Sequence, residues 1–439
     1  MLELLSSGLV SIWLEMAGVK IKPTDALDVV TWQSSPGLVI ANDPNPAGVN
    51  TVKEYLQGLI TTKLIAQNLG ESQGVWLQSG PMLMANHQGT TPLPAASLTK
   101  IATSLAAFTT LGPDYQFETT VATNGSVVNG VVQGDLIING DGDPMFVWEE
   151  AIALGNTLNK MGIKQVKGNL VITGNFAMNF QRHPQLAGQM VKQALNSKIW
   201  TRPPIYIHSI MPKGTAKPQV AINGTIKYSA QPIAKQTLLI RHRSIPLKQI
   251  IKEMNVYSNN EIAQMLADDI GGHLVVQDKA AKLARVPHSE IQLINGSGLG
   301  PENRISPRAV CAMLMALQQE AAAHQLNLAD LFPMSGFDHR GTMHFRHLPL
   351  ATVMKTGTLR DVSALAGVFP TRDRGLVWFA IINRGPQIGA FRQQQDKLIQ
   401  RLVQLLQIAP NTPTALTPHS PNSLPDLGNT KRSEIVYGG

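Results

Sequence analysis

Ser97 and Lys100 are the first residues whose types and spacing indicate chemistry. They lie three positions apart, so on a helix their side chains project from one face, a turn apart. A serine hydroxyl beside an amine is the Ser-Lys form of an activated nucleophile, in which the amine takes the hydroxyl proton. Because only a neutral amine acts as a base, burial or a nearby cation is expected to lower the pKa of Lys100.

Ser97 also has a purely structural interpretation. Ser is a preferred N-cap residue of helices, and Ser-x-x-Lys is expected about once or twice by chance in a chain of 439 residues. The motif therefore indicates catalysis only if other parts of the chain supply matching residues.

A second candidate is the run Lys355-Thr356-Gly357-Thr358. On an edge strand such a run offers backbone hydrogen bonds to an extended peptide substrate, and the lysine adds a cation. The glycine lets a ligand approach the strand closely. The alternative is an ordinary strand lysine that faces solvent.

The third candidate is Ser258-Asn259-Asn260, a Ser-x-Asn pattern in a predicted break between two helices. The same pattern recurs at Ser420-Pro421-Asn422, in the C-terminal tail. The pattern alone is therefore weak, and only its order between the other two motifs makes the first occurrence a candidate.

The elements that position these motifs follow from the apolar periodicity. Apolar residues at helical spacing predict helices over 51–67, 97–111, 246–254, 261–270, 307–322 and 391–407. Apolar runs at 75–78 and 82–85 predict a hairpin, and those at 351–357, 363–369 and 376–383 predict an antiparallel meander. Ser97 then begins a helix, and Lys355 lies on the first strand of the meander.

The remaining segments divide the chain. Short alternating runs between Gly and Asn turns predict an inserted β-rich domain over 118–240, with one helix at about 147–161. Residues 1–117 and 241–409 then form one discontinuous catalytic domain. The segment 410–439 is rich in Pro, Asn, Ser and Thr and is predicted to be a disordered tail.

The order of the three motifs resembles that of the active-site serine penicillin-recognising enzymes. Four runs, the last of which extends the strand motif by one residue, resemble boxes of the D-alanyl-D-alanine carboxypeptidase/endopeptidase family, the class C low-molecular-mass penicillin-binding proteins. They are Gly140-Asp141-Gly142-Asp143-Pro144, Asn295-Gly296-Ser297-Gly298-Leu299, Asn303-Arg304-Ile305-Ser306-Pro307 and Lys355-Thr356-Gly357-Thr358-Leu359. The resemblance covers about residues 75 to 405. It implies an α+β, penicillin-binding transpeptidase-like fold, an antiparallel sheet flanked by helices with an inserted domain.

The resemblance also implies roles for the motif residues. Ser97 is expected to be the nucleophile and Lys100 its base. Ser258 is expected to pass a proton to the leaving group, Asn260 to hold the substrate amide, and Lys355 to polarise that relay.

The strand motif is expected to bind substrate. By the same resemblance, Thr356 and Thr358 bind the terminal carboxylate beside Gly357. The backbone N–H groups of Ser97 and Thr358 form the oxyanion hole.

The implied activity is that of a serine-type D-Ala-D-Ala carboxypeptidase on peptidoglycan stem peptides, with D,D-endopeptidase action possible on cross-links. It proceeds through an acyl-enzyme, needs no cofactor or metal, and is inhibited by acylating β-lactams. A periplasmic or wall-associated location is implied. Two alternatives stay open: a β-lactam hydrolase or esterase on the same scaffold, and a catalytically silent wall-binding protein.

Composition adds limits. The net charge of +8 suits an anionic partner, but a scattered excess of Lys and Arg is the favoured explanation. The sequence has no basic run with interleaved aromatic residues, so binding to nucleic acid is not expected. Cys311 lies in an apolar helical run and is expected in the core. Segment 2–14 favours a short packed helix over an export signal, and no stretch is long and apolar enough to span a membrane.

Two patterns in the sequence imitate metal sites, but neither is predicted to bind a metal. Asn139, Asp141, Asp143 and Glu150 imitate a calcium loop, but Pro144 occupies the sixth place, where such a loop needs glycine. His339, His344 and His347 are better explained as residues of a solvated loop.

Overall fold

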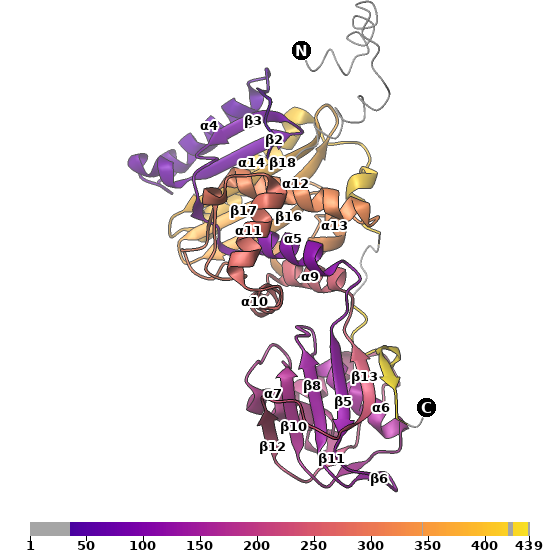
Figure 1. Ribbon diagram of the computed structural model, residues 1–439. Helices are drawn as coiled ribbons and strands as arrows, with labels where there is room; N and C mark the ends of the chain where they lie inside the picture. The colour runs from indigo at the N-terminus through magenta and orange to yellow at the C-terminus, as the bar shows by residue number, and fades with distance from the viewer. Residues whose placement is uncertain (1–35, 345, 420–424, 438–439) are drawn as a thin grey trace, which may run out of the picture.

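The computed structural model describes residues 36–344, 346–419 and 425–437. Two six-stranded sheets dominate it, and Figure 1 shows them in two bodies joined through β5 and β13. The first sheet has the order β1-β3-β2-β18-β17-β16 (Ala41–Asn42, Met82–His87, Gly74–Ser79, Gly375–Arg384, Val362–Thr371 and Val353–Leu359). The second has the order β12-β10-β8-β5-β13-β19 (Ile226–Ser229, Leu170–Asn175, Leu136–Asp141, Glu118–Thr123, Thr237–Arg243 and Ser433–Ile435).

The first sheet is the predicted hairpin joined to the predicted meander. The contacts β2–β3, β2–β18, β17–β18 and β16–β17 are all antiparallel, as expected. Side chains alternate along each strand, so Trp378 and Ala380 enter one core whereas Val377 and Phe379 enter the other. The sheet is therefore covered on both faces, and β16 is left at its edge.

Helices cover the two faces of this sheet unequally. One face is covered by α4 (Ala47–Thr61) and α14 (Ile388–Leu406). The other is covered by a larger group: α5 (Thr99–Leu111), α9 (Leu247–Tyr257), α10 (Asn260–Asp269), α11 (His273–Ala284), α12 (Pro307–Ala323) and α13 (Leu328–Leu331). Periodicity predicted α5, α9, α10, α12 and α14 to within about three residues at each end. It placed α4 too late, at 51–67 instead of Ala47–Thr61, and it missed α11. Cys311 of α12 is fully buried, as expected.

Small sheets complete the two bodies. One is the three-stranded sheet β14-β15-β4 (Ile291–Gln292, Arg304–Ile305 and Leu93–Pro94) of the first body, and its strand β4 comes just before the helix that carries Lys100. The four-stranded sheet β11-β9-β7-β6 (Ala221–Ile222, Gln165–Val166, Val131–Val132 and Val127–Val128) belongs to the second body.

The second body has more helix than the sequence indicated. Besides α6 (Trp148–Lys160), it contains α7 (Pro184–Ala194) and α8 (Arg202–Ile210), so the prediction of a single helix was wrong. Strands β8, β10 and β12 are parallel, because α6 and α7 provide crossover connections between them. Polar side chains and prolines in α7 and α8 weakened the helical pattern.

The prediction of a disordered tail also differs from the structure. Residues 410–419 and 425–437 are placed against the rest of the chain, and β19 pairs antiparallel with β13. Figure 1 shows this yellow segment beside the second sheet. Composition missed it because strand pairing and a few buried polar contacts hold the segment, without an apolar periodic face. The predicted helix at 2–14 lies outside the described residues.

Candidate active site

Ser97 lies in a tight 3₁₀ turn, Ala96–Leu98, directly before α5. The turn starts with Ala96 in the left-handed region at φ 49°, a strained conformation for a residue with a Cβ. Leu98 occupies the N-cap position of α5, and the helix starts at Thr99, two residues later than predicted. Ser97 is therefore not a helix cap, and its hydroxyl is free for another partner.

That partner is the amine of Lys100. The Ser97 Oγ lies 3.0 Å from Lys100 Nζ. Two further oxygens surround the amine: Asn260 Oδ1 at 2.7 Å and the Ser297 carbonyl at 2.7 Å. Both of these oxygens can only accept, so they take two N–H bonds. In the structure the third N–H of Lys100 donates to Ser97 Oγ. When the amine is deprotonated, its two remaining N–H groups can stay on the other two oxygens, and its lone pair can then accept the proton of the Ser97 hydroxyl.

Burial gives this amine the protonation state that a base needs. Lys100 is fully buried, no carboxylate within the described residues pairs with it, and burial lowers its pKa from 10.5 to about 7. A substantial fraction of the amine is thus neutral and available as a base near neutral pH, as the sequence analysis expected.

Lys355 provides a second buried amine from β16. It is also fully buried and donates to Ser258 Oγ at 2.8 Å and to the Thr356 carbonyl at 2.8 Å. Burial, and then repulsion from Lys100, holds the pKa of Lys355 well below its ordinary value. The alternative of a solvated strand lysine is therefore wrong.

The turn between α9 and α10 positions Ser258 and Asn260. Ser258 ends α9 in the left-handed conformation, with φ 54°. Asn259 then caps α10, because its side chain accepts a hydrogen bond from the Ile262 N–H. Asn260 is the first residue of α10, and its Oδ1 faces Lys100. The amide nitrogen of Asn260 is left for another acceptor.

Gly357 has a different contact from the one expected. A Cβ at this position would lie 2.9 Å from the Ala95 carbonyl and 3.2 Å from the Ala96 Cβ. The glycine therefore lets β16 approach the turn that carries Ser97, so its first effect is on the position of the nucleophile. β16 is the edge of its sheet, and only its start is covered, where the Met354 N–H donates to the Pro333 carbonyl. The rest of this edge has no further strand beside it among the described residues, so an extended peptide can pair there.

The loop at 295–298, which the sequence analysis gave only as a run resembling the family, contacts the amine of Lys100 on the side away from the cleft. The loop contains Asn295, Gly296, Ser297 and Gly298, and the Asn295 side chain accepts from the N–H groups of Ser297 and Gly298. Thr103 of α5 donates to the Gly296 carbonyl at 2.6 Å. These bonds hold the Ser297 carbonyl against Lys100, a role that no spacing could indicate.

The motif residues line one open cleft of ≈ 500 Å³. Its walls include Ser97, Tyr257, Ser258, Asn260, Gly341, Thr342, Arg346, Thr356, Thr358 and Arg392. The structure thus brings together the predicted Ser97, Ser258, Asn260, Thr356 and Thr358, with Lys100 and Lys355 directly behind them. Within the described residues no Asp or Glu lines this cleft.

Arg392 is the cleft residue that sequence reasoning missed with most consequence. It lies in the first turns of α14 and donates to Thr358 Oγ1 at 2.8 Å. The neighbouring Arg346 is paired with Asp396, whereas Arg392 forms no ion pair with a carboxylate among the described residues. Its only signal in the sequence is a cation on the polar face of the closing helix, which is common on any helix surface.

The two metal-site patterns do not form metal sites in the described chain. Glu150 is occupied by Arg432 and His242, and Asp143 accepts from the Met145 N–H. No group of three His, Cys, Asp or Glu side chains within the described ranges is arranged to hold an ion.

Comparisons with known proteins agree with this geometry. The chain is similar to the D-alanyl-D-alanine carboxypeptidase DacB of Haemophilus influenzae, with 24% identity over 406 residues, which covers 71% of this chain and 82% of that protein. Its fold is similar to that of the penicillin binding protein 4 (dacB) from the same organism, with a TM-score of 0.61 and 20% identity over 81% of this chain and 99% of that one. It is also similar to Bd3459, a predatory endopeptidase from Bdellovibrio bacteriovorus in complex with an immunity protein, with a TM-score of 0.65 and 23% identity over 79% and 96% of the two chains.

These structural similarities confirm the expected fold, a penicillin-recognising α+β fold with an antiparallel sheet flanked by helices. The model of the D-Ala-D-Ala carboxypeptidase 3 (S13) family matches residues 65–185 and 177–406, which is more than half of the chain. This chain therefore belongs to the D-Ala-D-Ala carboxypeptidase 3 (S13) family of serine peptidases.

Proposed function

We propose that this chain hydrolyses the D-Ala-D-Ala end of peptidoglycan stem peptides through an acyl-enzyme on Ser97. The observation that carries the proposal is the hydrogen-bond arrangement around Lys100: two carbonyl oxygens accept from its amine, and Ser97 Oγ lies 3.0 Å from the same nitrogen. This arrangement makes Lys100 the general base for Ser97.

Acylation then follows with balanced protons. Lys100 takes the Ser97 hydroxyl proton while Oγ attacks the carbonyl carbon of the scissile D-Ala-D-Ala peptide bond. The C–N bond breaks, and the leaving amine takes a proton from the Ser258 hydroxyl, which is refilled by Lys355 at 2.8 Å. The total charge of the two amines does not change in this step, because Lys100 gains one proton and Lys355 loses one.

Deacylation reverses this transfer. Water attacks the ester carbonyl, and its proton returns through Ser258 to Lys355. The ester C–O bond breaks as Lys100 returns the first proton to Ser97. The oxyanion formed in both steps is held by the backbone N–H groups of Ser97 and Thr358, and the free amide nitrogen of Asn260 binds the carbonyl of the substrate backbone.

We assign the substrate carboxylate to the Thr358 end of the cleft. Thr356, Thr358 and the unpaired charge of Arg392 lie there. A guanidinium has five N–H donors, so Arg392 keeps donors for a carboxylate while it contacts Thr358. This pairing favours substrates with a free carboxylate next to the scissile bond, which D-Ala-D-Ala ends provide.

The cleft also suits two related reactions. It is open along the edge strand β16, which agrees with endopeptidase action on a D-amino-acid cross-link, and one similar structure is named an endopeptidase. That endopeptidase has been seen acylated by penicillin G, so we propose that β-lactams acylate Ser97 here. The lack of a carboxylate along the described cleft walls gives no support to a dedicated β-lactam hydrolase.

The substrate implies the location. Peptidoglycan stem peptides lie outside the cytoplasmic membrane, so we propose a periplasmic or wall-associated enzyme. Within the described residues, none of the helices has the length and apolar character needed to cross a bilayer.

Two measurements on one variant test the proposal. The wild type should release D-Ala from a defined muropeptide and become covalently labelled by a fluorescent penicillin. Ser97→Ala should do neither while its melting temperature is unchanged, because Ser97 lies in a turn and makes no cap bond. Labelling that persists on another serine would contradict the assignment, and an intact wild type without either reaction would favour the silent wall-binding alternative.

A further inference from the structure

The positive charge of this chain is concentrated, not scattered as the sequence analysis favoured. Between Glu150 and Glu253 the sequence contains no Asp or Glu, so every charged residue of that stretch is Lys or Arg. The stretch forms most of the second body, from α6 to β13, and most of its Lys and Arg side chains are exposed. A cationic surface of this size attracts an anionic partner over several ångströms.

Helix α8 lies within this cationic region and is apolar on both of its faces. Its inner face, with Pro204, Ile207 and Met211 just after its end, packs into the core of the second body. Its outer face presents Ile205, Tyr206 and Ile210, which are 54%, 64% and 60% exposed. Surface helices normally carry polar side chains there, so this face is unusual for a helix in contact with water alone.

Basic residues surround the apolar side chains. At 100° per residue, Arg202 projects from the same half of α8 as Ile205 and Tyr206. Lys198 precedes the helix and Lys213 follows it, and all three cations are exposed. Ile199, 48% exposed, lies beside Lys198. We call this surface the α8 face and define it by Ile205, Tyr206, Ile210, Lys198, Arg202 and Lys213.

We infer that the α8 face binds the surface of a membrane that contains anionic phospholipids. Such a surface takes both parts of the face, since acyl chains and glycerol accept Ile and Tyr side chains while anionic headgroups attract Lys and Arg. An anionic wall polymer would use the cations but would leave three large apolar side chains in water. A second copy docked face to face would bring the two sets of cations together.

The test measures sedimentation of the full chain with vesicles. The wild type should bind vesicles of phosphatidylglycerol and phosphatidylcholine in equal amounts, and should not bind phosphatidylcholine alone. Binding should weaken as salt is added, because salt screens the charges. Absence of binding to the mixed vesicles would overturn the inference.

Two triple variants separate the parts of the face. The charge variant combines Lys198→Gln, Arg202→Gln and Lys213→Gln, and should lower the partition coefficient about a hundredfold. The apolar variant combines Ile205→Ser, Tyr206→Ser and Ile210→Ser, and should lower the partition coefficient at least about tenfold. At high salt, where the charges are screened, this variant should bind vesicles less than the wild type does.

Matched controls on the first body replace three exposed basic residues or three exposed large apolar residues. The charge control combines Lys53→Gln, Lys282→Gln and Lys397→Gln, which removes the same net charge. The apolar control combines Leu274→Ser, Leu350→Ser and Leu405→Ser, at sites 62%, 69% and 52% exposed. Both controls should bind vesicles within about threefold of the wild type.

Equal losses in face and control variants would reduce the effect to net charge and overturn it. Concentration-dependent self-association that only the apolar variant removes, without vesicle binding, would assign the face to a second copy. Penicillin labelling and melting temperature, measured for each variant, show that the cleft and the fold are intact, so this test can fail while the proposed activity stands.

Discussion

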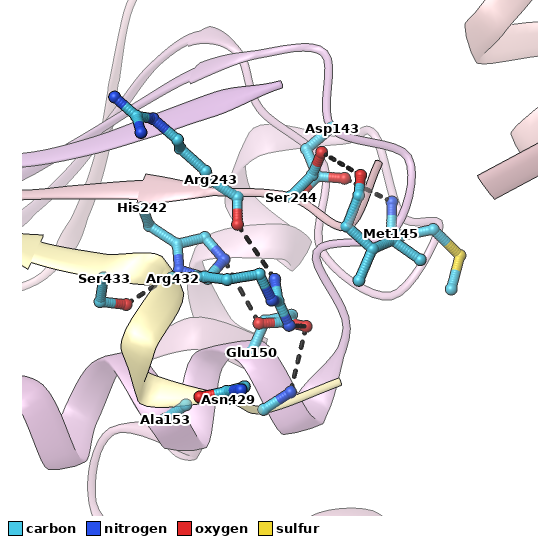
Figure 2. A network of polar contacts seen from close by, with 12 residues as sticks. Asp143, Met145, Glu150, Ala153, His242, Arg243, Ser244, Asn429, Arg432 and Ser433 are labelled. Carbon is cyan, nitrogen blue, oxygen red and sulfur yellow. Dashed lines mark hydrogen bonds and ion pairs between the residues drawn. The ribbon is translucent and has the colours of Figure 1, made fainter. Parts of the chain in front are cut away.

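Two groups of buried ionisable side chains in this chain differ in their partners: one lacks an opposite charge nearby among the described residues, and the other is paired with one. In the cleft, Lys100 and Lys355 are fully buried and meet only hydroxyl and carbonyl oxygens. In the second body, Glu150 is buried between Arg432, at 2.6 Å, and His242, at 3.3 Å. Figure 2 shows this Glu150 network, with Ser433 at the other side of the imidazole.

The difference appears in the pKa values. Burial lowers the pKa of both cleft amines, and nothing restores it. Burial by itself raises the pKa of Glu150, but the hydrogen bonds and charges of His242 and Arg432 outweigh it and hold that pKa below its ordinary value. Burial without an opposite charge makes Lys100 a base for chemistry. Burial of Glu150 against Arg432 instead forms an ion pair that joins the tail to the second body.

The largest expected effect is at Lys100. Lys100→Met keeps the volume of the side chain but removes the base, so acylation by penicillin should slow by about 10³-fold or more. No carboxylate in the described part of the chain pairs with this buried amine, so its removal should leave the melting temperature within a few degrees. Stopped-flow or quench labelling measures the rate. A loss of less than tenfold would show that another group accepts the Ser97 proton.

Lys355→Ala should have the next largest effect. Removal of one preorganised cation from such a site typically slows the reaction by about 10²–10³-fold. The wild-type rate should rise as pH increases through about 7, where Lys100 becomes neutral. Because repulsion between two cations is mutual, the loss of Lys355 should raise the pKa of Lys100 and move this rise to higher pH.

The pH profile distinguishes the two roles of Lys355. A uniform loss with the rise unmoved would leave only its hydrogen bond to Ser258 as its contribution. A wild-type rate in the variant would remove Lys355 from the site altogether.

Arg392→Ala should have a smaller and more selective effect. We expect a loss of about tenfold in kcat/KM for a D-Ala-D-Ala substrate, through KM, because the carboxylate loses one charge-assisted contact. The same peptide with a C-terminal amide should be hydrolysed equally by variant and wild type. Arg401→Ala, on the same helix but paired with Glu54, is the matched control and should change neither. Equal losses on acid and amide would contradict the carboxylate role.

Arg432→Ala should leave catalysis unchanged, although it should destabilise the second body. Removing one partner of a buried ion pair costs about 3–5 kcal/mol, here because Glu150 stays buried. Since the pKa of Glu150 is held below 4.5, the network contributes at neutral pH, and this contribution is lost as pH falls through the lowered value. Hydrogen exchange of β5, β8 and β13 should report the loss.

Truncation after Ala409 should reproduce that loss, contrary to the expectation for a disordered tail. Penicillin labelling serves as the control for the cleft, and it should be at the wild-type level in both variants. Unchanged hydrogen exchange in both variants would show that the tail contributes nothing to the stability of the second body.

Autonomous folding of segment 118–240, expected from the sequence, stays a prediction.

The sequence by itself determined the three motifs, the antiparallel meander and most helices around the cleft. Each depends on local signals: apolar periodicity sets the elements, and the Ser-x-x-Lys and Lys-Thr-Gly spacings place chemistry at a helix start and on a strand. It also determined the concentration of Lys and Arg in the second body, although the net charge of the whole chain does not show where these residues lie.

Only the tertiary structure decided the features that depend on contacts between distant segments. These include the Ser297 carbonyl at Lys100, Arg392 beside Thr358, the approach of Gly357 to the Ala95 carbonyl, and the Arg432–Glu150 pair. None of them leaves a local pattern, because each partner alone is an ordinary residue. Folding alone removes both lysines from water, and that burial makes Lys100 a base.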